Sequence, residues 1–161
     1  MLAAPLGHPL VDEGVDVVAI DADLSASTGG NQFGEKYPER WLTVGVAEQN
    51  MVGIAAGLAA AGKTAFIASF AVFLPGRCFV QLRPAVAQPG GGMNVEAVAS
   101  HGGVTVGEDG MSAQALEDLG LVGAGTRDRA PDLVGEDDRI ELGVRCRCEL
   151  AGAGRLRARV A

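Results

Sequence analysis

The first part of the chain alternates short apolar runs with longer segments of small and apolar residues. The short runs are rich in β-branched residues and are bounded by glycine or a polar residue, so they predict strands buried on both faces of a sheet. They span residues 15–20, 41–46, 64–69 and 93–99. No comparable periodicity follows residue 118. We therefore expect residues 1–118 to form the domain and residues 119–161 to form a poorly ordered tail rich in Gly, Ala and Arg.

Three segments between and after these strands predict helices. Residues 47–61 are small and apolar almost throughout and end at Gly62, which is a C-cap signal. Residues 76–87 predict a second helix, with a kink or an early stop at Pro84. Ser112 is a predicted N-cap for a third helix that runs through residue 118.

Strands that alternate with helices favour right-handed crossovers and therefore an α/β fold with a parallel sheet. In such sheets, ligands bind beyond the carboxyl ends of the strands. The segments that follow those ends here cover residues 21–30, 47–50, 69–73 and 100–110. We expect functional side chains in these four segments.

The composition narrows the class of protein. A chain of 161 residues with 48% hydrophobic and 20% charged residues suits one packed domain. Its formal net charge of −7 argues against a nucleic-acid or anionic-membrane binder, because both need a cationic surface. No segment has the pattern of a membrane span or a secretion signal, so we expect a soluble, cytoplasmic protein. Cys78, Cys146 and Cys148 are an odd number without zinc-site spacing, so neither disulfides nor zinc should organise the fold.

Glu48 directly follows a predicted strand and opens a helix whose other residues are nearly all uncharged. In one interpretation it is a helix N-terminal glutamate that interacts with the helix dipole and caps free amide groups. In the other it is a poorly solvated carboxyl at the ligand-binding edge, able to hold a proton near neutral pH. The position alone leaves both interpretations open.

Two further segments carry candidate residues. Phe70 and Phe73, three residues apart after a strand, are either core residues or a flat wall for a planar ligand. The glycine-rich loop 101–110 lets the backbone approach a ligand closely, and it carries His101 and Asp109. An ordinary turn explains this loop about equally well.

The polar segment after the first strand contains Asp23 and Ser27, and turn or capping chemistry explains it as well as ligand binding does. Several signatures are missing from the sequence. It has no G-x-G-x-x-G after a strand, which disfavours dinucleotide binding. The letters G-x-x-x-x-G-K-[ST] occur at residues 57–64, but there they end a predicted helix and precede a strand, which is the reverse of the strand–loop–helix order of a phosphate-binding loop and disfavours nucleoside-triphosphate binding. The sequence has no G-x-S-x-G elbow, which disfavours a hydrolase.

Four blocks of sequence, taken together, resemble the pyrimidine-binding domain of transketolase, in particular the split archaeal and bacterial form whose C-terminal section is a separate chain. The blocks are DADLSAST (21–28), KYPERWLTVGVAEQNMVGIAAGLAAAGK (36–63), FIASFAVFLPGRCFVQLR (66–83) and NVEAVASHGGVTVGEDGMSAQALED (94–118). They occur in the order and spacing of that family. The resemblance implies a thiamine-diphosphate-binding fold of the pyrimidine-domain type, an α/β parallel sheet with helices on both faces, incomplete at its C-terminus.

The resemblance also implies roles for the candidate residues. Glu48, in the AEQ motif, would be the catalytic glutamate that hydrogen-bonds a ring nitrogen of the aminopyrimidine of thiamine diphosphate. It would favour the imino tautomer, whose exocyclic nitrogen removes the proton of the thiazolium carbon. The cofactor contacts would be Asp23, Glu48, Phe70 and Phe73, and the substrate contacts would be Ser27, His101 and Asp109. The implied reaction moves a two-carbon ketol unit between the sugar phosphates of the pentose phosphate pathway.

Three features depart from the family pattern. Ala113 stands where the family usually has a histidine before the glutamine of EDGxxHQ, and Gly76 stands where some relatives have a tyrosine on the cofactor wall. The family binds diphosphate and Mg²⁺ through a GDG segment followed by an asparagine, and no GDG occurs in this chain. The resemblance therefore implies a separate partner chain that carries the diphosphate-binding domain and the Mg²⁺ ligands, within a homo- or hetero-oligomer. No metal ligand is expected in this chain.

Two alternatives to a transketolase-type subunit stay open. The first is a different enzyme on the same scaffold, such as a deoxyxylulose-phosphate synthase or the β-type subunit of an oxo-acid dehydrogenase. The second is a non-catalytic fragment, favoured by Ala113 and by the tail. The tail, residues 119–161, matches no continuation of the family and has the composition of a GC-rich gene read out of frame. We hypothesise a frameshifted or truncated gene, which would leave a sheet edge exposed.

Overall fold

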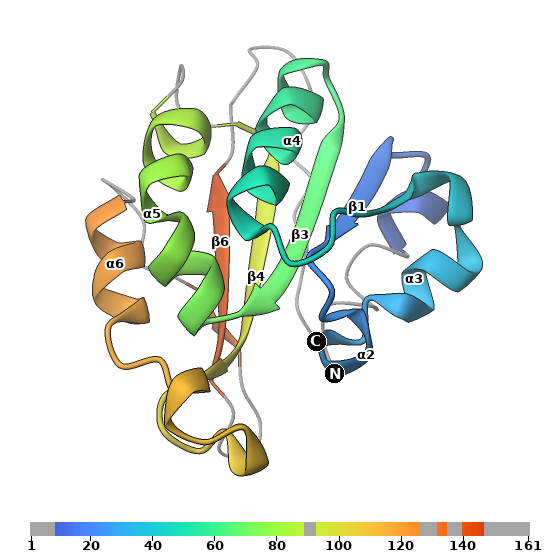
Figure 1. Cartoon of the computed structure of the whole chain (residues 1–161). Coiled ribbons are helices and arrows are strands. Elements are labelled where there is room, and N and C mark those ends of the chain that lie inside the picture. Colours follow the sequence, from blue (N-terminus) through green and yellow to red (C-terminus); the bar gives the residue numbers. More distant parts are fainter. Residues whose placement is uncertain (1–8, 89–92, 126–131, 135–139, 147–161) are drawn as a thin grey trace.

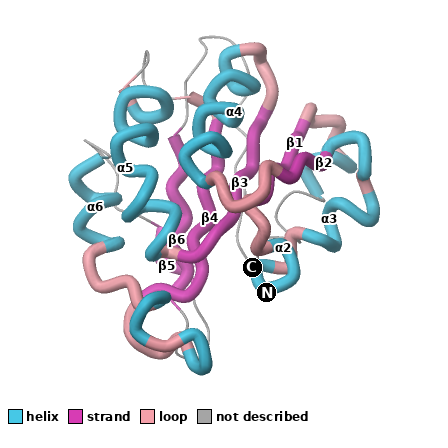
Figure 2. Tube along the Cα trace, viewed as in Figure 1, coloured by secondary structure: helices cyan, strands magenta, loops and turns pink. Residues whose placement is uncertain are grey.

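A six-stranded sheet in the order β2-β1-β3-β4-β6-β5 forms the centre of the molecule (Figures 1 and 2). The structure is a computed structural model that describes residues 9–88, 93–125, 132–134 and 140–146. The four parallel strands are β1 (Val17–Asp21), β2 (Trp41–Thr43), β3 (Thr64–Phe70) and β4 (Val95–Gly102). The strands β6 (Ile140–Cys146) and β5 (Asp132–Val134) extend the sheet in antiparallel fashion beyond β4.

Helical segments connect each parallel strand to the next. The short helices α2 (Ser25–Thr28) and α3 (Asn31–Lys36) lie between β1 and β2, and α4 (Glu48–Ala60) lies between β2 and β3. A helical segment that contains α5 (Cys78–Gln81) leads from β3 to β4. This arrangement confirms the expected α/β fold with a parallel sheet.

The strand β1 is buried on both sides because helices cover both faces of the sheet. Val18 and Ile20 belong to the larger core cluster, into which α4 and α5 pack. Val17 and Ala19 point the other way and form a second cluster with Phe33 of α3. Figure 1 shows α4, α5 and α6 together on one face, with α2 and α3 on the other side of β1. Successive side chains of a pleated strand point to opposite faces of the sheet. Because both faces are covered here, the four residues 17–20 are all apolar.

Helix α3 approaches β2 closely because Gly34, inside the helix, and Gly30, its N-cap, have no side chains. A Cβ atom on Gly30 would lie 2.9 Å from the Trp41 ring, and a Cβ atom on Gly34 would lie 2.9 Å from Trp41 Cγ. These glycines are four residues apart and therefore on the same side of the helical turn. The Trp41 indole occupies the space that side chains at positions 30 and 34 would need.

The connection between β3 and β4 is helical over a longer stretch than expected. It begins at Val72 rather than at residue 76, and its first and last parts, Val72–Arg77 and Leu82–Ala87, form the wider π-type turns on either side of α5. These parts contain Pro75 and Pro84. Proline lacks an N–H group and its ring clashes with the carbonyl of the preceding turn, so a regular α-helix is not expected to continue through these positions.

The helix expected from Ser112 through residue 118 is wrong. Only the single turn Met111–Ala113 is helical there, and α6 begins at the end of the expected range and spans Asp118–Gly125. Ala115 instead pairs with Gly103 through two backbone hydrogen bonds of 2.8 and 3.0 Å. This bridge holds the chain extended where local signals favour a helix.

The second strand is also shorter than expected, because β2 ends at Thr43 and Val46 is 72% exposed. In the tail, β6 pairs with β4, so the edge of β4 that was expected to be open is covered by this strand. Residues 126–131, 135–139 and 147–161 lie outside the described residues, and their expected poor order stays a prediction.

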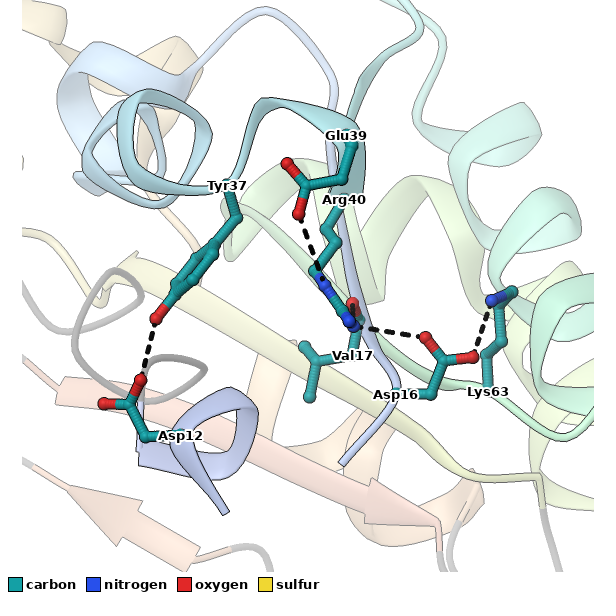
Figure 3. Close-up of polar contacts among 7 residues, drawn as sticks. All are labelled: Asp12, Asp16, Val17, Tyr37, Glu39, Arg40 and Lys63. Atoms are coloured by element: carbon teal, nitrogen blue, oxygen red, sulfur yellow. Dashed lines mark hydrogen bonds and ion pairs between the residues drawn. The ribbon is translucent and has the colours of Figure 1, made fainter. Parts of the chain in front are cut away.

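A network of charged side chains joins three segments at the amino end of β1 (Figure 3). Asp16 accepts hydrogen bonds from Lys63 Nζ at 2.7 Å and from Arg40 Nη1 at 3.1 Å. The Tyr37 hydroxyl donates to Asp12 nearby. The network lies at the opposite end of β1 from the polar loop that follows Asp21.

Within the described part of the chain, no helix combines the length and the apolar composition that a membrane span needs.

Candidate cofactor site

Glu48 is the first residue of α4 and is buried at the edge of the sheet. Only 3% of its side chain is exposed, and its Oε2 atom accepts a hydrogen bond of 3.0 Å from Arg77 Nη1. The burial expected for a ligand-binding carboxyl is therefore present. The neighbours of Glu48 within α4 are nearly all uncharged, and its cationic partner Arg77 comes from the next helical segment.

Arg77 is the residue of this site that the sequence patterns did not single out. It lies four residues after Phe73, so the two share one face of the helical segment. Its guanidinium carbon lies 4.9 Å from the centre of the Phe73 ring. The Gln49 side chain also donates a hydrogen bond of 3.0 Å to the Arg77 backbone carbonyl and so ties the start of α4 to this segment. The four-residue spacing between Phe73 and Arg77 was the one signal in the sequence that could have identified Arg77 as part of this site.

The aromatic residues continue the row of contacts. The Phe70 and Phe73 rings are stacked, with centres 6.1 Å apart and planes at 10°. The His101 ring lies 4.0 Å from the Phe70 ring, and its Nδ1 atom is 2.9 Å from Ser100 Oγ. Four of the predicted site residues, Glu48, Phe70, Phe73 and His101, are thus linked in one row through Arg77.

The loop after β1 is built on a buried carboxylate. Asp21 is 2% exposed, and its oxygens accept the backbone N–H groups of Asp23 at 2.8 Å and of Leu24 at 3.2 Å. Burial raises the pKa of the Asp21 carboxyl, while the hydrogen bonds from these amides act in the opposite direction. Asp23 itself is exposed and has a positive φ of 66°. His101, at the end of β4, also has a positive φ, of 59°.

A small apolar cluster brings three loops to the same edge. Phe70, Val106 and Ala113 are buried together, with Leu24 and Phe73 packed against them. Leu24 lies in the loop after β1, and Val106 and Ala113 bracket Asp109. The cluster explains how segments more than eighty residues apart meet beyond the carboxyl ends of the strands.

The remaining predicted residues lie at this edge without a described contact to Glu48. Ser27 is exposed in α2, and Asp109 is exposed in the turn Gly107–Asp109. Ser69, which no pattern singled out, is fully buried at the end of β3, and its hydroxyl has no hydrogen-bond partner. A buried hydroxyl without a partner is unusual in proteins, and it marks a place for an additional polar group.

Ala113 and Gly76, the two single residues that depart from the family pattern, occupy different environments. Ala113 is buried in the apolar cluster, so this position presents no proton-carrying group. Gly76 is exposed, and a Cβ atom added there would meet nothing within 4 Å.

Among the described residues, no group of three or more His, Cys, Asp or Glu side chains is placed to hold a metal ion. A small cavity of about 20 Å³ lies on the opposite face of the sheet and is lined by apolar residues, Phe33 and Trp41 among them. It does not include Glu48.

The fold and the site define an α/β domain that presents a buried carboxylate and two stacked aromatic rings at the carboxyl edge of its parallel strands. Comparison with known proteins agrees with this class. The family model described as transketolase, pyrimidine binding domain, matches residues 8–124. The chain belongs to this family.

Several relatives support the assignment. A protein of Methanocaldococcus jannaschii named as a transketolase C-terminal section is 47% identical over 121 residues, which are 73% of this chain and 38% of the relative. A 6-deoxy-6-sulfo-D-fructose transketolase subunit of Clostridium sp. (strain MSTE9) is 42% identical over 66% of this chain and 32% of its own length. Human transketolase is 41% identical over 65% of this chain and 16% of its own length.

A solved structure shows the same relationship in three dimensions. It is titled a split gene transketolase, inactive beta4 tetramer, and it superposes with a TM-score of 0.60 at 41% identity. The match covers 73% of this chain and 36% of the solved chain. This chain therefore spans less than two fifths of the length of each of these relatives.

Proposed function

We propose that this chain is a transketolase-type subunit that binds the aminopyrimidine of thiamine diphosphate and transfers a two-carbon ketol unit between sugar phosphates. The observation that carries the proposal is the buried Glu48 carboxylate, which the Arg77 guanidinium joins to the stacked rings of Phe73 and Phe70. A cytoplasmic location and a role in pentose phosphate metabolism are part of the same proposal.

The residues present fit the heterocycle of this cofactor. An aminopyrimidine is flat and carries ring nitrogens, so it needs an aromatic surface and a hydrogen-bonding carboxyl, which Phe73 and Glu48 provide. Burial of Glu48 keeps water from competing for that hydrogen bond. The free hydroxyl of Ser69 is a further buried polar group at this edge. Thiamine diphosphate, when bound, supplies the carbanion chemistry of such enzymes.

The roles of this chain's own residues follow from their positions. Glu48 would hold a proton in its hydrogen bond to the ring nitrogen and so tune the cofactor without touching substrate. Phe70 and Phe73 would orient the heterocycle and exclude water from it. Asp23 would lie near the cofactor, and the exposed Ser27 and Asp109, with His101, would bind the sugar-phosphate hydroxyls or phosphate.

The proposal requires a second chain. Mg²⁺ and the diphosphate would be held by a partner that carries the diphosphate-binding domain, since this chain lacks the GDG segment of the family. Association with that partner, within a larger homo- or hetero-oligomer, would complete the site. The split-gene relative supports this arrangement, because its title describes a tetramer of one subunit type that is inactive.

The decisive experiment is co-expression with a diphosphate-domain chain and measurement of ketol transfer. Glu48→Ala should lower turnover at least about a hundredfold, the lower end for a positioned proton-transfer group. Glu35→Ala, which removes an exposed carboxyl on α3, is the matched control and should leave turnover unchanged. Activity that survives Glu48→Ala would remove Glu48 from this role.

Two alternative functions are separated by simple measurements. Product formation from pyruvate in place of a ketose phosphate would favour a deoxyxylulose-phosphate synthase or an oxo-acid dehydrogenase β-type subunit. The non-catalytic alternative is favoured by Ala113, which is buried among apolar residues where the family usually has a histidine. Binding of the partner and cofactor without turnover in the wild-type protein would support it.

A further inference from the structure

The guanidinium group of Arg77 makes two contacts at once. It donates a hydrogen bond of 3.0 Å to Glu48 Oε2, and its central carbon lies 4.9 Å from the centre of the Phe73 ring. A buried carboxylate and an aromatic face are the same two surfaces that the proposed function assigns to an aminopyrimidine. A planar, nitrogen-rich group of the chain itself therefore already covers both.

The two members of this ion pair differ in how firmly they are held. Glu48 is 3% exposed at the start of a helix of 13 residues, whereas the Arg77 side chain is 48% exposed. Arginine has a long apolar stem, and its charged head enters water readily. Arg77 is thus the partner that can move.

We propose that Arg77 is a positioning residue that occupies the heterocycle subsite of the free chain and is displaced when a planar nitrogen heterocycle binds. The inference rests on the proposed function. It makes Arg77 a determinant of specificity, because a ligand must replace both the N–H donor to Glu48 and the flat group on Phe73. When Arg77 covers the site in most molecules, the apparent affinity for the ligand equals the intrinsic affinity multiplied by the fraction of molecules in which the site is uncovered.

The test uses the full chain and 4-amino-2-methylpyrimidine, which carries the heterocycle without the diphosphate. Its dissociation constant is measured by NMR titration for the wild type, Arg77→Met and Arg77→Lys. Methionine keeps an apolar stem beside Phe73 without a charge, and lysine keeps the charge without the planar group. Arg83→Met is the matched control, since Arg83 is exposed in the same helical segment.

The expected result is that Arg77→Met binds the pyrimidine roughly two- to fivefold more tightly than the wild type, which corresponds to removal of a half-exposed ion pair. Arg77→Lys should fall between them, and Arg83→Met should match the wild type. A purely structural role for Arg77 would weaken binding in both Arg77 variants instead. Equal or weaker binding by Arg77→Met, or no binding by any variant, would overturn the proposal.

The double variant Glu48→Ala/Arg77→Met separates the failure of this inference from that of the proposed function. It should lose the binding gained by Arg77→Met. If binding depends on Glu48 but is not improved by Arg77→Met, the displacement is wrong and the role of Glu48 stands. If the double variant binds as tightly as Arg77→Met, the pyrimidine does not contact Glu48, and both proposals fail.

Discussion

The carboxylate of Asp21 holds the backbone of Asp23 in place, since it accepts the Asp23 N–H group at 2.8 Å from within the protein. Asp21 closes β1, and Asp23 is one of the residues proposed to lie near the cofactor. The positive φ of Asp23 is a conformation that few residues adopt without such support. A buried acid that the proposed chemistry does not use thus shapes the edge on which that chemistry depends.

Asp21→Asn should change the pH dependence of stability. Because burial raises the folded-state pKa of Asp21 above its unfolded value near 3.9, the folded wild type binds this proton more tightly than the unfolded chain does. The free energy of unfolding should therefore fall as the pH rises from about 4 through the folded pKa. Asparagine does not titrate, so this fall should disappear in the variant, with a loss of about 1–2 kcal/mol from one weakened backbone hydrogen bond.

Urea unfolding between pH 4 and 7, followed by the fluorescence of the single tryptophan, Trp41, measures this effect. Asp23→Asn, which changes the exposed neighbouring carboxyl and tolerates a positive φ, is the control. Parallel pH curves for the wild type and Asp21→Asn would show that the buried carboxyl does not contribute.

Asp16→Asn should affect stability at lower pH and in the opposite direction. The hydrogen bond from Lys63, followed by the positive charges of Lys63 and Arg40, lowers the folded pKa of Asp16 below its unfolded value, whereas desolvation acts the other way (Figure 3). Its contribution is therefore present above about pH 3.9 and is lost as the pH falls through the folded pKa. The wild type should lose more stability than Asp16→Asn on acidification below that value.

The same unfolding measurement in 1 M salt provides a check on the Asp16 network. Exposed ion pairs are screened at this ionic strength, so the difference between the wild type and Asp16→Asn should shrink. A difference that is independent of salt would argue that Asp16 acts through something other than charge.

Two glycine-to-alanine changes should have opposite effects. Gly34→Ala places a Cβ atom 2.9 Å from Trp41 Cγ, close to the stem of the indole, so it should destabilise the protein by about 1–3 kcal/mol. Gly53→Ala lies inside α4 with nothing within 4 Å, so it should stabilise the isolated chain by about 0.5–1 kcal/mol. Urea unfolding of both variants measures the contrast, and effects of the same sign would contradict the described packing of α3 on Trp41.

Cys78 should be unreactive in the folded protein. Its side chain is fully buried, and burial together with the nearby charge of Glu48 raises the pKa of the thiol to about 12. The thiolate is the reactive form, so labelling with a disulfide reagent at pH 8 should be at least about a hundredfold slower than in urea. The double variant Cys146→Ser/Cys148→Ser leaves Cys78 as the single thiol, and rapid labelling of that protein under native conditions would be inconsistent with its burial.

The sequence predicted the central part of the fold because short apolar runs alternate with helical segments, and the run at β1 is apolar since both faces of that strand are covered. Boundaries were less predictable. The end of β2 at Thr43, ahead of the exposed Val46, depends on where its pairing with β1 stops. The helix expected from Ser112 is replaced by the Gly103–Ala115 bridge, which joins residues twelve apart and competes with local helix signals.

For the site, local chemistry in the sequence determined which residues to consider: a carboxyl at the start of an apolar helix, two phenylalanines after a strand and a glycine-rich loop after another. Only the tertiary structure decided that Arg77 pairs with Glu48. The two residues are 29 positions apart on different helices, and the orientation of α4 against the segment after β3 fixes their distance. Charge neutralisation in a buried site depends on that packing, which no single stretch of sequence specifies.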